Sequence, residues 1–254
     1  MNITILPAYK DNYIYILHCD QTHETAVIDP GEAGPVLDFL NETGWSLTQI
    51  WLTHHHWDHI NGAEDLKDLY PEAKMIGAAA DAHRLPDLDI ALSEGDEFDF
   101  AGTRVQILET PGHTLGHIAY YVPAAEALFC GDTVFSLSCG RLFEGSAADM
   151  WSSLQKIRAL PPETKIYCGH EYTAMNCKFA KHIQPDNPAL EAYIAKVKKL
   201  RANKQPTMPM DVATESACNP FFQCDSPAIA ETVGLKDTEP SKILAELRHL
   251  KDNF

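Results

Sequence analysis

The stretch that decides the fold is Thr53-His54-His55-His56-Trp57-Asp58-His59, which places four histidines and one aspartate within six residues. In an extended or turning backbone, residues two apart point the same way. We therefore expect His54 and His56 to hold one metal ion while Asp58 and His59 turn towards a second. Imidazole nitrogen binds Zn, Fe and Mn well. The carboxylate of Asp58 adds a hard oxygen ligand to the second site.

This stretch has two other interpretations. A solvated polyhistidine loop or an affinity tag also concentrates histidine, but a tag lies at a terminus and does not enclose Trp57 and Asp58. His55 alternates with its neighbours and faces away from them, so we do not count it as a ligand.

Composition limits the classes of function. The 254 residues are 45% hydrophobic and 22% charged, which is ordinary for a soluble globular protein. The formal net charge is -16, which argues against a nucleic-acid partner and against an anionic membrane surface. An anionic substrate would therefore need a local patch of cations, or bound divalent ions, to bind.

Cysteine usage and the N-terminus indicate the compartment. Seven cysteines at irregular spacing, with no Cys-x-x-Cys, are typical of reduced thiols rather than of a disulfide framework. The start of the sequence lacks a basic segment followed by a long apolar run, and no stretch is long enough to span a bilayer. We expect a cytoplasmic monomer.

Hydrophobic patterning predicts a mixed α/β protein. Runs of β-branched and aromatic residues predict strands over residues 13–17, 25–29, 49–52, 105–108, 118–122, 127–130 and 165–168. Helical spacing predicts helices over 33–43, from near 62, and over 149–160, 172–183, 188–204 and 240–251, with 205–227 irregular. The predicted strands end before residue 171, and the segments after it are mostly helical. We therefore expect a mixed α/β domain over 1–171 and a helical domain over 172–254.

Three further candidate ligands each follow a predicted strand. His113 lies in a Pro-Gly-His turn, Asp132 follows Cys130-Gly131, and His170 follows Cys168-Gly169. Together with the opening stretch they complete the set that two metal ions need: His54, His56 and His113 for one ion, Asp58, His59 and His170 for the other, and Asp132 bridging both. Such ions lie roughly 3.5–4 Å apart and hold a hydroxide between them, which can attack a carbonyl carbon.

Each of these residues also has a simpler interpretation. His113 could be a loop histidine, Asp132 a turn former or helix cap, and His170 a core histidine. We favour a structural role for His117. Asp29 is a turn residue by default, or else a partner that orients a ligand histidine.

Four segments carry a family resemblance: Thr53–His59, Thr110–His117, Phe129–Thr133 and Cys168–Thr173. They resemble the metallo-β-lactamase superfamily, and within it the glyoxalase II (hydroxyacylglutathione hydrolase) branch, which residues 140–145 and 247–254 also resemble. The resemblance covers essentially the whole chain. It implies an αββα metallo-β-lactamase-like sandwich followed by a smaller helical C-terminal domain, and it implies the same binuclear ligand set, most simply with zinc, with Fe or Mn as alternatives.

The resemblance further implies a substrate and a reaction. The substrate would be the thioester S-D-lactoylglutathione, hydrolysed to D-lactate and glutathione in the second step of methylglyoxal detoxification, with Asp58 and Asp132 as the catalytic carboxylates. Matching motifs imply that the glutathione moiety is contacted by Arg141, Phe143, Tyr172, Arg248 and Lys251. Some relatives carry lysine at position 141 and tyrosine at 143, which changes the hydrogen-bond geometry there. From spacing alone, Arg248 and Lys251 would instead be a solvated helix face.

Three rival functions fit the same scaffold. A glutathione persulfide dioxygenase uses one redox-active iron, and the full second-metal set argues against it. A phosphodiesterase or nuclease conflicts with the acidic charge balance. A non-catalytic metal-binding module is hard to reconcile with ligands drawn from three separate loops.

Overall fold

A computed structural model describes all residues from 1 to 254, and these form two compact units. The first unit contains residues 1–109 and 115–131, and the second contains residues 110–114 and 132–254. The predicted functional domains, 1–171 and 172–254, follow a different criterion and stay a prediction. No helix combines the length and apolar character that a bilayer crossing requires.

The first unit is built on a mixed six-stranded sheet. Its strands, in spatial order, are β1 (Asn2–Ala8), β2 (Asn12–His18), β3 (Thr25–Ile28), β4 (Gln49–Trp51), β5 (Lys74–Ala78) and β6 (Ile90–Leu92). The β1–β2 and β2–β3 pairs are antiparallel, and from β3 to β6 the pairing is parallel. The carboxyl ends of β3 and β4 therefore meet at one edge, and this edge presents Asp29 and the Thr53–His59 stretch.

A second layer of strands in the same unit packs on Trp51 of β4. It consists of β7 (Glu97–Phe100), β8 (Thr103–Glu109), β9 (Ile118–Val122) and β10 (Ala127–Gly131), paired antiparallel in the order β10-β9-β8-β7. The fully buried Trp51 ring stacks on Tyr120 at 5.2 Å and meets Phe98 and Phe129 edge-on at 5.3 and 6.2 Å. Large aromatic side chains thus fill the space between the two layers, where each buries 150–250 Å² or so.

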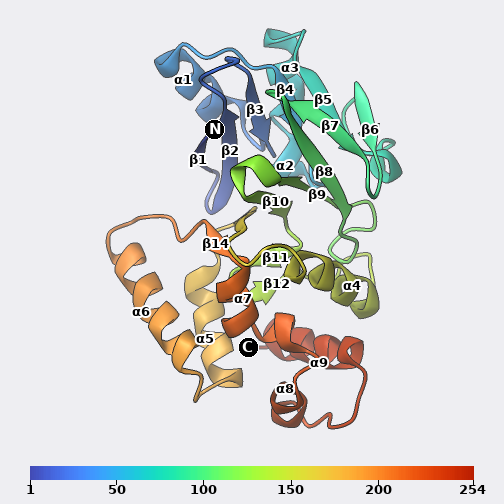
Figure 1. Cartoon of the computed structure of the whole chain (residues 1–254), viewed down its shortest axis with the longest axis vertical. Helices are drawn as coiled ribbons and strands as arrows, with labels where there is room; N and C mark the ends of the chain where they lie inside the picture. The colour runs from blue at the N-terminus through green and yellow to red at the C-terminus, as the bar shows by residue number, and fades with distance from the viewer. The chain divides into compact units, whose positions relative to one another are not determined.

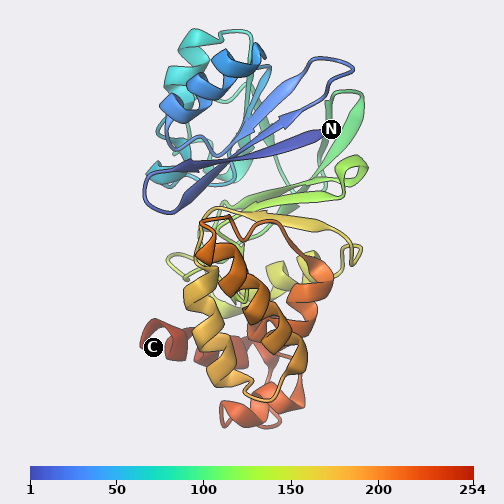
Figure 2. The same ribbon diagram turned by 90° about the vertical axis from the view of Figure 1, so that its left-hand side faces the viewer.

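Two helices cover the opposite face of the first sheet, as Figures 1 and 2 both show. They are α1 (Ala33–Thr43) and α3 (Ala63–Leu69). Val36, Leu40 and Leu66 pack with strand residues such as Ile16 and Ile50 in one apolar cluster. Helix α1 ends at a glycine in the left-handed conformation, Gly44, as the sequence predicts.

Most of the second unit is helical. Its elements are β11 (Val134–Phe135), β12 (Ser138–Cys139), α4 (Ala147–Arg158), β13 (Lys165–Cys168), α5 (Thr173–Ile183), α6 (Pro188–Ala202), β14 (Met210–Asp211), α7 (Val212–Cys218), α8 (Pro227–Thr232) and α9 (Pro240–Asp252). Helix α4 begins with a capping box in which Ser146 and Asp149 bond each other's backbone N–H groups. Helices α5 and α6 lie side by side, as both ribbon views show (Figures 1 and 2).

One prediction about local structure was wrong. Residues 205–227 are not irregular, because they contain α7, whose N-cap is Asp211. Its sequence, Val-Ala-Thr-Glu-Ser-Ala-Cys, is rich in weak helix formers, so tertiary packing decides its conformation. The metal-ligand stretch turns, as expected: Thr53 and His54 form a bend after β4, and a short helix, α2 (Trp57–Ile60), follows His56.

Candidate metal centre

The first unit places two histidine nitrogens face to face. His54 is buried three residues after the end of β4, and its Nε2 lies 3.1 Å from Nδ1 of His56. Two imidazole nitrogens at this distance must share either a proton or a cation, because two bare lone pairs would repel. The prediction that residues 54 and 56 point the same way is therefore confirmed.

The next two candidate ligands lie on α2. Oδ2 of Asp58 is 3.7 Å from Nε2 of His59, so these donor atoms also face each other. Asn12, at the start of β2, donates from Nδ2 to Oδ2 of Asp58 at 2.9 Å. This asparagine could not be identified from sequence, since it lies 46 residues from Asp58 and belongs to no motif.

Asp29 orients one of these ligands. This buried residue has φ +50°, so it makes the chain reversal after β3, and its Oδ2 lies 3.0 Å from Nδ1 of His59. It also accepts hydrogen bonds from the backbone N–H and the hydroxyl of Thr53, at 2.8 and 2.7 Å. A carboxylate beside Nδ1 keeps the proton there and leaves the lone pair of Nε2 for a cation. Both roles considered for Asp29, turn residue and orienting partner, are present in the structure.

His55 is directed elsewhere. Its Nδ1 lies 2.9 Å from Oδ2 of the buried Asp81, whose other oxygen accepts from Nε of Arg84. His117 is fully buried, and its ring stacks on His54 with centroids 4.7 Å apart. These contacts agree with the interpretation of both histidines as supports rather than ligands.

The second unit contains the other three candidate ligands, two histidines and the carboxylate that lies between them. Oδ2 of Asp132 lies 3.4 Å from Nε2 of His113 and 3.3 Å from Nε2 of His170. Nδ1 of His113 donates to the backbone carbonyl of Arg141 at 2.8 Å, which leaves its Nε2 directed at Asp132. The His170 ring stacks on Tyr172 with centroids 4.8 Å apart and planes 3° apart. One aspartate oxygen within reach of two histidines is the arrangement expected of a shared ligand.

Backbone glycines make this arrangement possible. Gly112, next to His113, has φ +147°, and a Cβ at Gly145 would lie 2.7 Å from its Cα. A Cβ at Gly140 would lie 2.0 Å from the carbonyl oxygen of Asp132. The two loops that present His113 and Asp132 therefore approach neighbouring backbone more closely than any larger residue would allow.

The donor atoms in both units fit divalent ions such as zinc. All are imidazole nitrogens or carboxylate oxygens, and His59 and His113 each bond a protein oxygen through the nitrogen that faces away from the other donors.

The residues predicted to contact substrate all belong to the second unit. Arg141 is exposed, and its Nε lies 3.3 Å from Oδ1 of Asp252. Phe143 is exposed beside His113, with ring centroids 5.1 Å apart. Tyr172 is half-buried on His170. The proximity of Phe143 and Tyr172 to two candidate ligands is consistent with a substrate-contacting role.

Arg248 and Lys251 lie on α9 and are less exposed than a solvated helix face would be. Arg248 is 7% exposed, donates from Nη1 to the carbonyl of Cys139 at 2.9 Å, and contacts Asp252 through Nη2 at 2.9 Å. The ammonium of Lys251 lies over the Phe179 ring. Burial, together with the neighbouring Arg248, lowers the pKa of Lys251 to about 8. The interpretation of Arg248 as a solvated residue was wrong.

Comparisons with known proteins add to this geometry. A family model described as metallo-beta-lactamase superfamily matches residues 11–170, and one described as hydroxyacylglutathione hydrolase C-terminus matches residues 171–254. A curated relative from Ruegeria pomeroyi, named hydroxyacylglutathione hydrolase, is 45% identical over 254 residues, covering 100% of this chain and 99% of the relative. One of the same name from Rhodospirillum rubrum is 47% identical with the same coverage. The crystal structure of the B3 metallo-beta-lactamase BLEG-1 has a TM-score of 0.68 at 21% identity, covering 87% of this chain and 99% of that one, and so shares the fold.

Proposed function

We propose that this chain, which belongs to the hydroxyacylglutathione hydrolase family of the metallo-beta-lactamase superfamily, is a thiolester hydrolase acting on S-2-hydroxyacylglutathiones. The specific substrate is S-D-lactoylglutathione, and the products are D-lactate and glutathione. The observation that carries this proposal is the match over the whole chain, including the C-terminal model at residues 171–254, since that segment contains Tyr172, Arg248 and Lys251.

The proposed cofactor is a pair of divalent metal ions, most simply zinc, with iron or manganese as alternatives. His54, His56 and His113 would hold one ion, Asp58, His59 and His170 the other, with Asp132 shared. Support comes from the facing donor atoms within each unit, such as Nε2 of His54 with Nδ1 of His56. When bound, such ions polarise a carbonyl oxygen and lower the pKa of water from 15.7 towards about 7.

Asp58 is the proposed residue that orients the attacking water. Its Oδ2 accepts a hydrogen bond from Asn12, and its backbone carbonyl accepts a second from the same amide at 3.2 Å. These two hydrogen bonds hold the Asp58 carboxylate in one orientation. A carboxylate held in this way can accept a hydrogen bond from the attacking water and orient it. The thiolate leaving group has a pKa of about 8.5 in a free cysteine, so it needs little help from a general acid.

Recognition of glutathione is assigned to Arg141, Phe143, Tyr172, Arg248 and Lys251. Arg141 and Lys251 would pair with the two carboxylates of this anionic tripeptide. Arg248 also has a positioning role, because its hydrogen bond to Cys139 ties α9 to β12. Asp252 contacts both Arg141 and Arg248 and so fixes their mutual arrangement.

Three further features of the proposal rest on sequence. The catalytic domain covers residues 1–171 and the substrate-binding domain covers 172–254. The protein is a cytoplasmic monomer, and its seven cysteines, all buried, suit a reducing compartment.

The test is thioester hydrolysis, followed by release of free thiol from S-D-lactoylglutathione, with metal content measured on the same sample. Asp132→Ala and His56→Ala should reduce turnover to the background rate and lower the bound metal. His55→Ala is the matched control, because Nδ1 of His55 faces Asp81 and His55 is not a proposed ligand, and this variant should keep its metal. Substantial turnover by either ligand variant would overturn the proposal. Oxygen uptake with glutathione persulfide, in place of thiol release, would identify the chain as a dioxygenase instead.

A further inference from the structure

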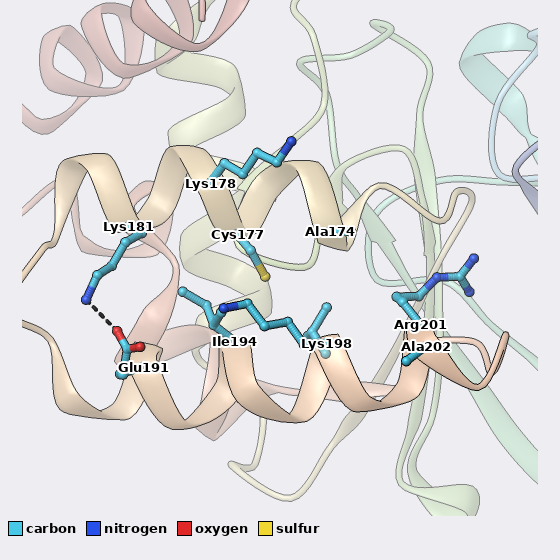
Figure 3. A pocket seen from close by; sticks show the side chains of 10 residues that line it. Ala174, Cys177, Lys178, Lys181, Glu191, Ile194, Lys198, Arg201 and Ala202 are labelled. Carbon is cyan, nitrogen blue, oxygen red and sulfur yellow. Dashed lines mark hydrogen bonds and ion pairs between the residues drawn. The ribbon is translucent and has the colours of Figure 1, made fainter.

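A groove of about 580 Å³ runs between α5 and α6 (Figure 3). It is separate from every residue proposed above as a metal ligand or a substrate contact. The lining residues are Ala174, Cys177, Lys178, Lys181, Glu191, Ile194, Val197, Lys198, Arg201 and Ala202. Cavities of about 300–1,000 Å³ are the size that small molecules occupy in proteins.

The floor of the groove is apolar. Cys177, Ile194 and Val197 are buried there, and Ala174 and Ala202 leave space where larger side chains would fill it. Burial raises the pKa of the Cys177 thiol to about 12, so at neutral pH this thiol is uncharged and behaves as a small hydrophobic group. The floor can therefore accept a hydrocarbon segment without leaving a polar atom unpaired.

Cations gather along the walls. Four of the chain's 20 basic residues, Lys178, Lys181, Lys198 and Arg201, line this one groove in a protein whose net charge is -16. The single acidic lining residue, Glu191, forms an ion pair with Lys181 at one end of the groove (Figure 3). The groove therefore carries a local positive charge that opposes the charge of the whole molecule.

Lys198 is the cation best placed to meet a ligand. Its aliphatic stem lies along the groove between the two helices in Figure 3, so its ammonium is near the apolar floor. No acidic side chain forms an ion pair with Lys198 or with Lys178. Arg201, by contrast, is bonded to Glu171 at 3.3 Å and to the carbonyl of Gln205 at 2.9 Å.

We propose that this groove is a second ligand site, which binds a medium-chain aliphatic carboxylate. The hydrocarbon tail lies on the floor formed by Cys177, Ile194 and Val197, and the carboxylate pairs with Lys198. Charge complementarity and an elongated apolar floor together select an anionic amphiphile over a neutral or cationic one. The site does not depend on the proposed hydrolase activity.

The experiment is isothermal titration calorimetry of the full-length protein with decanoate as the probe. Hexanoate tests the tail, decyltrimethylammonium tests the charge, and sulfate tests an anion without a tail. We expect one decanoate per chain, an affinity that rises about fourfold per buried methylene between hexanoate and decanoate, and no binding of the cationic amphiphile or of sulfate at this site.

Variants assign the binding to the groove. Lys198→Glu should weaken decanoate binding by at least about tenfold, because an attraction becomes a repulsion at short range. Lys198→Arg should keep the affinity within about threefold, since the positive charge remains. Ala174→Phe should block the floor. The matched control is Lys199→Glu, which makes the same change of charge on the neighbouring residue outside the groove and should leave binding unchanged.

Several outcomes would overturn the proposal: no heat with decanoate, equal binding of decyltrimethylammonium, or an unchanged affinity in Lys198→Glu. Sedimentation of the same samples tests whether a second copy of the chain, and not a fatty acid, occupies the groove. A concentration-dependent dimer that Lys198→Glu abolishes, without decanoate binding, would show that a second copy of the chain covers this face. Thiol release from lactoylglutathione, measured in parallel, should be equal in Lys198→Glu and Lys199→Glu whichever result is obtained.

Discussion

The substitution Asp29→Asn replaces one carboxylate oxygen with an NH₂ group and should weaken metal binding while every proposed ligand residue stays in place. Asp29 accepts three hydrogen bonds, from the backbone and hydroxyl of Thr53 and from Nδ1 of His59. If asparagine keeps its oxygen on the Thr53 N–H, its NH₂ group faces the hydroxyl and Nδ1 of His59. The hydroxyl can accept a hydrogen bond, but Nδ1 must then give up its proton, which moves to Nε2. The nitrogen proposed to bind metal would carry a hydrogen instead of a lone pair.

The size of the effect follows from this inverted contact. Loss of a hydrogen-bonding partner behind a ligand histidine typically costs 10- to 100-fold in metal affinity or activity, or about 1.4–2.7 kcal/mol. The backbone should tolerate the change, because asparagine is among the few residues that readily adopt the positive φ found at position 29.

The assay is competition for the metal between the protein and a chelator of known affinity, together with turnover of lactoylglutathione at saturating metal. Asp81→Asn is the matched control, because Asp81 is also a buried carboxylate on a histidine Nδ1, but on His55, which is not a proposed ligand. It should lower the midpoint of thermal unfolding and leave metal affinity unchanged. The reasoning fails if Asp29→Asn retains the native affinity, or if both variants lose the same amount.

Three further predictions concern the second unit. Lys251, whose pKa is lowered to about 8, should lose its charge as the pH rises through 8, so KM for lactoylglutathione should increase there while kcat changes little, and Lys251→Met should have a high KM with no such pH dependence. Burial raises the pKa of Glu215 from 4.5 to about 7, so the folded state holds its proton more tightly than the unfolded chain, and this contribution to stability is complete below pH 4.5 and is lost as the pH rises to 7. The free energy of unfolding in urea, measured for wild type and for Glu215→Gln, should therefore show a difference between the two proteins that changes with pH. The wild-type value should fall by about 3 kcal/mol relative to the variant between pH 4.5 and 7, and a constant difference would contradict this prediction. Arg248→Met removes the hydrogen bonds to Cys139 and Asp252 and should lower the free energy of unfolding by about 2 kcal/mol, which an unchanged denaturation midpoint would refute.

The elements that sequence patterning predicted best are those with a continuous signal. Strands β9 and β13 occupy the predicted residues, because their apolar runs are uninterrupted and bounded by turns. Strand β5 was not predicted, since its sequence, Lys-Met-Ile-Gly-Ala, mixes strand and non-strand residues. Helix α2 contains only four residues, which is too short for a helical period to be detected.

The contacts of the candidate site also fall into two groups, those that sequence patterning predicts and those that it does not. The facing nitrogens of His54 and His56 could be predicted, because residues two apart in an extended or turning backbone point the same way. The contact of Asn12 with Asp58 joins residues 46 positions apart, and that of Asp81 with His55 joins residues 26 apart. Neither Asn12 nor Asp81 belongs to a repeating pattern, so these two contacts can be identified only from the folded structure.

Trp57 gives the metal stretch an optical signal of its own. This indole, between His56 and Asp58, is 65% exposed, whereas Trp51 is fully buried among aromatic rings. An indole in water emits at a longer wavelength than one in an apolar core, and it is reached by dissolved quenchers such as iodide. Trp57 is the most exposed of the four tryptophans, because Trp45 is half-buried against His18 and Trp51 and Trp151 are buried. The red edge of the native emission should therefore report mainly on the segment that carries four of the seven proposed ligands, without any label being attached.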